Sequence, residues 1–189
     1  PGVLDFGRWA TGHPEAWMVQ QESEVADSQN GNIIRMVFNI SASCGVRTEE
    51  MMRKGATVVG LIDLLEQAGK RVELDLISGS RGNNCSIRNV VRVKESSAPV
   101  DIERLAFAIA HPGTHRRLSF SLWEQAPLGA RQLCGIPNGG YGMPEDFSPE
   151  PDDKALYIPS SSMEHFGTEA ARVAWVTHQL AEQGVVFED

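Results

Sequence analysis

The residues that could do chemistry begin where an apolar run ends, in the stretch "IIRMVFNISASCG" at positions 33–45. Asn39, Ser41 and Ser43 alternate there with small residues. Their side-chain oxygens could ligate a hard cation such as Mg²⁺, which prefers oxygen ligands and carboxylate charge. The same residue types also turn and cap the backbone routinely. The stretch is therefore either a cation-binding loop that lacks a carboxylate or the turn after a buried strand.

Cysteine and histidine side chains are the next candidates. Cys44, Cys85 and Cys134 are an odd number without a C-x-x-C pair. This count predicts neither a disulfide framework nor a zinc site, and it favours a reducing, cytoplasmic setting. Cys44 could be a nucleophile beside the Asn39 loop, but we expect a buried or half-buried structural thiol. His111 and His115 lack an identifiable nucleophile nearby, so we expect structural roles for both.

A glycine-rich loop and two tryptophans are candidates for binding. No helix start follows the loop "GIPNGGYG", although a phosphate-binding loop requires one. We interpret it as a partner-binding loop in which Gly139 and Gly140 precede Tyr141 at the tip. Trp9 and Trp17 lie close in sequence, and leaving both in water would be costly. They should pack on the main body of the protein or on a partner.

Composition narrows the classes of function. The 189 residues suit one compact domain with a hydrophobic core. No apolar run is long enough to span a bilayer, so we expect no membrane segment. The net charge of −8 argues against a broad electrostatic contact with nucleic acid. Because the chain begins at Pro1 and not at methionine, we expect it to start partway into a longer polypeptide.

Hydrophobic periodicity predicts strands and helices that alternate along the chain. Capping residues at Thr48, Asp101 and Thr168 predict three helix starts. The predicted order is strand 33–40, helix 48–69, strands 71–78 and 85–95, helix 101–112, strand 116–125, loop 126–154, strand 155–161 and helix 168–184. This order predicts an α/β three-layer domain at 33–189 with a mostly parallel sheet and one antiparallel edge strand. Residues 1–32 form a tryptophan-containing segment, read as a short helix and an irregular piece, that packs on this core.

The order of elements and the loop after the first strand resemble the von Willebrand factor A domain over residues 33–188. In that family the loop binds a divalent cation through an aspartate and two serines, and later loops complete the coordination. The resemblance implies that Asn39 replaces the aspartate and that Ser41 and Ser43 match the serines. A second aspartate of that family comes from a later loop, and the resemblance implies that Glu124 takes its place. It therefore implies a degenerate site with no cation, or with weakly bound Mg²⁺.

The whole chain also resembles a group of uncharacterised phage- and plasmid-encoded proteins, through "RWATGHPEAW", "FNISAS", "DIERLAFAIAHPG" and "GGYG". Two functional hypotheses follow. The first is a non-catalytic module that binds another protein, such as an ATPase, through the carboxyl-end loops of its sheet. The alternative is a metal-dependent or single-stranded nucleic-acid-binding factor, in which Trp9, Trp17 and Tyr141 stack on bases and Arg116 and Arg117 contact phosphates.

Overall fold

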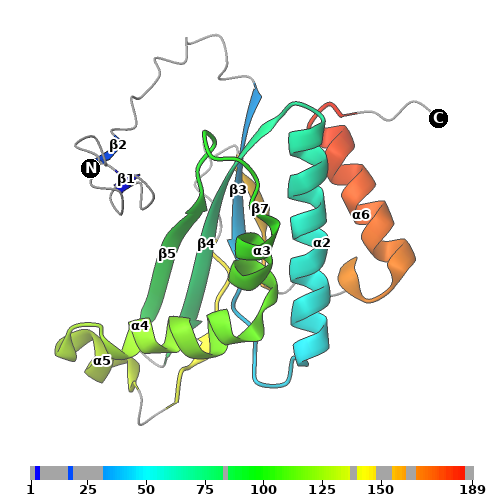
Figure 1. The fold of residues 1–189 in the computed structure, drawn as a ribbon. Coiled ribbons are helices and arrows are strands. Elements are labelled where there is room, and N and C mark those ends of the chain that lie inside the picture. The colour runs from blue at the N-terminus through cyan, green and yellow to red at the C-terminus, as the bar shows by residue number, and fades with distance from the viewer. Residues whose placement is uncertain are drawn as a thin grey trace. The chain divides into compact units, whose positions relative to one another are not determined.

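A computed structural model gives the architecture of the chain (Figure 1). It describes residues 3–4, 17–18, 32–82, 85–136, 140–147, 155–160 and 165–185. The chain divides into two compact units, Pro1–Gly31 and Asn32–Asp189.

In the first unit, β1 (Val3–Leu4) pairs antiparallel with β2 (Trp17–Met18), and Leu4 lies opposite Trp17. Trp9 and the short helix predicted around it lie outside the described residues.

The sheet of the second unit has the strand order β5-β4-β3-β7. Strand β3 (Ile33–Asn39) is parallel to both β4 (Arg71–Arg81) and β7 (Leu156–Ile158). Strand β5 (Ser86–Lys94) is antiparallel to β4 at the edge of the sheet. The predicted mixed α/β domain, with a mostly parallel sheet and an antiparallel edge strand, is confirmed.

Beyond the end of β3, the short strand β6 (Met143–Pro144) pairs with Ser80 and Arg81 of β4. This pairing brings the glycine-rich loop to the carboxyl end of β4.

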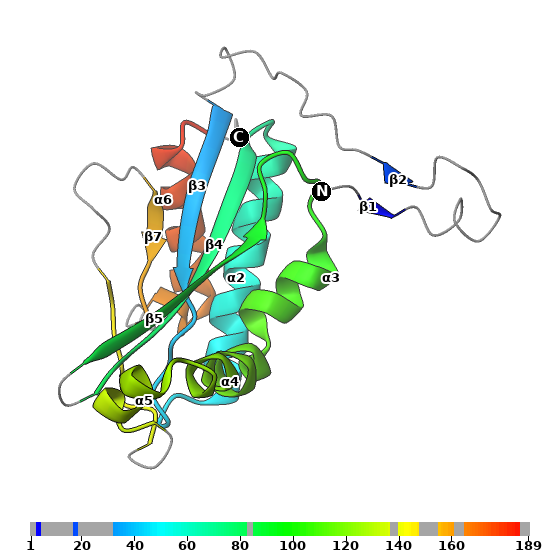
Figure 2. The same ribbon diagram turned by 90° about the vertical axis from the view of Figure 1, so that its left-hand side faces the viewer.

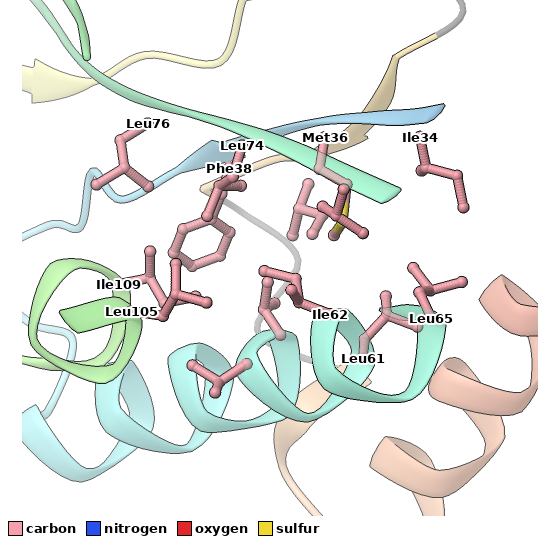
Figure 3. Close-up of a cluster of buried hydrophobic side chains, with 14 of the residues drawn as sticks. Ile34, Met36, Phe38, Leu61, Ile62, Leu65, Leu74, Leu76, Leu105 and Ile109 are labelled. Atoms are coloured by element: carbon pink, nitrogen blue, oxygen red, sulfur yellow. The ribbon is translucent and has the colours of Figure 1, made fainter. Parts of the chain in front are cut away.

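The core lies between the sheet and the helix α2 (Thr48–Gln67). Figure 3 shows side chains from alternate positions of β3 and β4 above one face of α2. The buried contacts join Ile34, Met36, Phe38, Leu74 and Leu76 to Val58, Leu61, Ile62 and Leu65. Alternation on the strands and the three-to-four-residue spacing on the helix put all of these side chains on facing surfaces.

The starts of two helices match the prediction, and one differs by a residue. Asp101 caps α3 (Ile102–Leu105), and Thr168 caps α6 (Glu169–Glu182). The cap of α2 is Arg47 and not Thr48, because the Glu50 carboxylate accepts a hydrogen bond from the Arg47 N–H at 2.9 Å.

Figure 2 shows α2, α3 and α6 behind the same face of the sheet. The described helices thus establish one helical layer on the sheet, and the three-layer arrangement stays a prediction.

The strand predicted at 116–125 is wrong, because this segment is helical. After α3 come a π-helical turn η2 (Ala106–Ala110), a second π-helical turn η3 (Thr114–Ser119) and α4 (Phe120–Glu124). Leu118, Phe120 and Leu122 alternate as in a strand. The residues that the fold buries are instead His115, Ser119 and Trp123, which recur every four positions on one helical face.

The segment predicted as a loop at 126–154 contains the helix α5 (Leu128–Cys134), which ends at Gly135 with φ +71°. Cys134 forms a disulfide with Cys85 at a Cα–Cα distance of 5.5 Å. The bridge links α5 to the residue before β5. The expectation drawn from the cysteine count is therefore wrong for this pair, because its partners lie far apart in sequence and meet only in the fold.

Among the described residues, none of the helices combines the length and the apolar character needed to cross a membrane.

Candidate functional site

Asn39 ends β3 and is buried in a hydrogen-bond network. Its Nδ2 donates to the Glu145 carbonyl oxygen at 2.8 Å and lies 3.1 Å from Asp146 Oδ1. Its Oδ1 accepts a hydrogen bond from the Ser41 N–H at 3.0 Å. The amide therefore fixes the end of β3 to the chain that follows β6, and a cation could bind Oδ1 only by competing with Ser41.

Ser41 joins the end of β3 to β4. Its Oγ donates to the Gly79 carbonyl at 3.0 Å and accepts from the Gly79 N–H at 2.8 Å. The hydroxyl is buried. It bonds to the Gly79 backbone just beyond Asn39 and Ile77, where the parallel pairing of β3 with β4 ends, and so replaces a backbone partner there. Both geometries support the interpretation of Asn39 and Ser41 as a strand-end turn.

The other two predicted ligands lie elsewhere. Ser43 lines a pocket beyond the strand end. Glu124 is on α4 and not at the end of a strand, and its carboxylate accepts a hydrogen bond from the Tyr141 hydroxyl. Within the described part of the chain, no three His, Cys, Asp or Glu side chains are grouped so that they could hold a metal ion.

The pocket at the carboxyl ends of β3 and β4 has a volume of about 610 Å³. We call it the aromatic pocket. Its lining comes from the loop after β3, the end of β4, the helical segment 114–124 and the chain at 141–144. The lining residues are Ala42, Ser43, Cys44, Gly79, Ser80, His115, Arg116, Phe120, Trp123, Tyr141, Gly142, Met143 and Pro144.

Three aromatic rings form one wall of this pocket. Phe120 and Tyr141 stack with their centroids 4.0 Å apart and their planes within 5°. The ring centroids of Trp123 and Phe120 are 5.2 Å apart, and Trp123 is only 1% exposed. The Trp123 Nε1 has no hydrogen-bond partner among the described residues. A buried indole N–H usually has a partner, so Trp123 is an exception to this pattern.

The rim of the pocket next to Tyr141 is held close to β4 by a glycine. Gly142 has φ +74°, and a Cβ on it would lie 2.4 Å from Ser80 Oγ and 2.5 Å from the Arg81 carbonyl oxygen. Ser80 Oγ also donates to the Tyr141 carbonyl. Next to it, Met143 is 66% exposed. The glycine thus permits the close approach that puts Tyr141 and Met143 beside the end of β4.

The Tyr141 hydroxyl is tied to α4. Its hydrogen bond to Glu124 raises the pKa of Tyr141 above its ordinary value. The phenol therefore stays protonated at neutral pH and acts as a hydrogen-bond donor. Of the predicted glycines in this loop, Gly140 has φ +83°, and Gly139 lies outside the described residues.

His115 lines the pocket but is only 3% exposed. Its Nδ1 is 3.4 Å from Ser78 Oγ. Burial lowers the pKa of His115 to about 4, although a hydrogen bond to the Ala42 backbone opposes the effect. The ring is therefore neutral at pH 7, and its edge packs against Phe120 at 5.1 Å. This contact and the bond to Ser78 join α4, η3 and β4.

Cys44 differs from the expectation of a buried or half-buried thiol. It is a free, exposed cysteine on the loop after β3, and it lines the aromatic pocket. The turn that begins at Ser43 carries it out of the core, because Ser41 is the last side chain of this loop that bonds into the sheet.

The sequence predicted Ser43 and Tyr141 as site residues. It did not predict that Trp123, Phe120 and Met143 line the same pocket. The four-residue spacing of His115, Ser119 and Trp123 was the signal that could have revealed the helix. Nothing in the sequence indicates that this helix meets the glycine-rich loop.

The fold and the pocket define a mixed α/β domain with a concave aromatic site at the carboxyl ends of its central strands. A protein-family model described as "Domain of unknown function (DUF7192)" matches residues 2–186. The chain belongs to this family. No curated protein and no solved structure matches the chain.

Proposed function

We propose that the chain is a non-catalytic protein-binding domain that receives its partner at the aromatic pocket. The observation that carries the proposal is the pocket itself, at about 610 Å³ with a wall of three aromatic rings and an exposed methionine on its rim. Tyrosine, tryptophan and methionine are enriched in protein interfaces, and aromatic anchors supply much of the binding energy there.

The position of the pocket agrees with the same function. Ligands of open α/β sheets bind outside the carboxyl ends of the strands. An antiparallel β5 at the edge of β5-β4-β3-β7 supports the resemblance to the von Willebrand factor A domain, and we propose this fold family, with its three layers, for the chain. We also propose that the chain is part of a phage- or plasmid-encoded protein. Only the sequence resemblance supports this origin.

We propose that the strand-end loop holds Mg²⁺ weakly or not at all. A cation there would have to displace the hydrogen bonds of Asn39 Oδ1 and Ser41 Oγ, at 2.8–3.0 Å. The alternative of a metal-dependent or nucleic-acid-binding factor has less support, because Glu124 is engaged by Tyr141 and the net charge is −8.

We propose the cytoplasm as the location, in which case Cys85 and Cys134 exchange between thiol and disulfide forms, because cytosolic disulfides are usually transient. Alkylation of cell extracts quenched in acid tests this point. A pair that is fully oxidised in the source cell would contradict a cytoplasmic location.

The test of the binding function is selection from a displayed library of random peptides. We expect selected peptides to share an aromatic or large aliphatic residue. Their binding should weaken about tenfold or more in Met143→Asp, the equivalent of at least about 1.4 kcal/mol. Val173→Asp is the matched control, since Val173 is an exposed apolar residue on α6. Selected peptides without an apolar consensus, or equal effects of the two variants, would refute the proposal.

A further inference from the structure

The outer edge of strand β5 has no strand partner among the described residues. The strand lies at the end of the strand order, and Figure 1 shows it at the outer side of the sheet. Within the described part of the chain, its backbone hydrogen bonds go only to β4. The outward N–H and C=O groups of such a strand are a template on which an extended peptide can add another strand.

An apolar groove of about 240 Å³ runs beside this edge, on the side that faces the helices. We call it the edge groove. Val91 of β5 is 46% exposed, and Phe107, Leu118 and Leu122 of the helical segment are also about half exposed around it. Large apolar side chains that gather on a surface mark an interaction site.

The edge groove is distinct from the aromatic pocket. Segment 114–124 separates them, because Phe120 and Trp123 line the pocket whereas Leu118 and Leu122 line the groove. Asn89 of β5 also lines the groove, and its buried Nδ2 has no hydrogen-bond partner among the described residues.

The charged residues of β5 indicate which kind of strand could pair with its outer edge. On the face opposite the groove, Arg92 is already paired with Asp75 and Glu73. Arg88 is exposed 5.0 Å from the Phe147 ring centre and forms no ion pair within the described residues. A second copy that paired antiparallel about Val90 would place Arg88 opposite Arg92 of that copy, which is unfavourable. A strand that carries carboxylates is complementary.

We propose that β5 and the edge groove receive an extended segment of another protein, in which apolar and acidic residues alternate. The segment adds a strand to the outer edge of β5. Its apolar side chains enter the groove beside Val91 and Leu122, and its carboxylates lie on the other face near Arg88. The surface operates independently of the aromatic pocket.

The probe is a short capped peptide in which valine and glutamate alternate, and a valine–lysine peptide is the comparison. Titration into ¹⁵N-labelled protein, up to millimolar peptide, should shift the amide signals of β5 and slow their exchange with solvent.

Val91→Lys should weaken binding about tenfold or more, whereas Val90→Lys should have little effect. These two valines are matched, since they are 46% and 54% exposed on opposite faces of one strand. Arg88→Glu should reverse the preference towards the lysine peptide.

Any of four results would overturn the proposal. One is the absence of β5 shifts at millimolar glutamate peptide. Another is an equal response to both peptides, or equal losses in Val90→Lys and Val91→Lys. The last is a concentration-dependent dimer of the protein alone that Val91→Lys abolishes, because the occupant would then be a second copy. None of these results changes the outcome of the peptide-library experiment with Met143→Asp, which tests the aromatic pocket. The edge-groove proposal and the aromatic-pocket proposal can therefore fail separately.

Discussion

Replacing His115 with glutamine should remove part of the acid sensitivity of the fold. In the folded protein, burial lowers the pKa of His115 from 6.5 to about 4. In the unfolded chain the ring titrates near 6.5. Between these values the unfolded state binds more protons than the folded state, so stability falls as the pH falls from 6.5 to 4. Well above pH 6.5 the ring is neutral in both states, and its contribution to stability no longer changes with pH.

The magnitude follows from the difference between the two pKa values. One pKa unit corresponds to about 1.4 kcal/mol, so the full loss is about 3 kcal/mol. About 2 kcal/mol of this loss falls between pH 7 and pH 5. Asp75 does not interfere in that window. Its hydrogen bond to Arg92 lowers its pKa below 3.8, so its stabilisation is lost only at lower pH.

Urea unfolding at pH 7, 6 and 5 measures the effect. We expect the wild-type free energy of unfolding to fall by about 2 kcal/mol more than that of His115→Gln over this range. His178→Gln is the control, because His178 lies exposed on α6. It should follow the wild type. Parallel losses in the wild type and His115→Gln would refute the assignment of a buried, neutral imidazole.

Three further outcomes follow from the strand-end loop and the disulfide. Ser41→Ala should lower the free energy of unfolding by about 2 kcal/mol in urea titrations, since it leaves the N–H and C=O of Gly79 without the Ser41 hydroxyl; an unchanged midpoint would contradict this role. Cys134→Ser should destabilise by roughly 2–4 kcal/mol in non-reducing buffer and by nothing in reducing buffer, given the 49-residue separation from Cys85; equal losses in both buffers would indicate a packing effect. Replacing chelator with millimolar Mg²⁺ should leave the thermal midpoint unchanged, and a rise that Ser43→Ala abolishes would show a bound cation.

Several elements could be predicted from the sequence because local pattern and tertiary burial agree. The nearly continuous apolar run of β3 predicted a strand, and α2 and α6 combine apolar periodicity with a start signal. The strand predicted at 116–125 was wrong because local pattern and burial disagree there. Leu118 and Leu122 face the edge groove, where they stay half exposed, so their alternation with Phe120 does not reflect burial.

Two parts of the candidate site could be predicted from the sequence. Ser43 lies in the loop after β3, and the glycine-rich loop around Tyr141 has a recognisable composition. Trp123 and Met143 join the pocket through the packing of separate segments. Gly142 lets one of these segments approach β4, and a glycine in a sequence does not reveal which backbone it will meet.

The central claim, that the aromatic pocket binds apolar groups of a partner, is tested most directly by disulfide trapping at Cys44. This exposed free thiol lines the pocket, so thiol-bearing fragments can be captured there and identified by mass. We predict that aromatic and large aliphatic fragments are retained over polar ones of equal thiol reactivity, and that Met143→Asp removes the preference while Val173→Asp keeps it. Capture that follows thiol reactivity alone, with no preference for apolar fragments, would contradict the account.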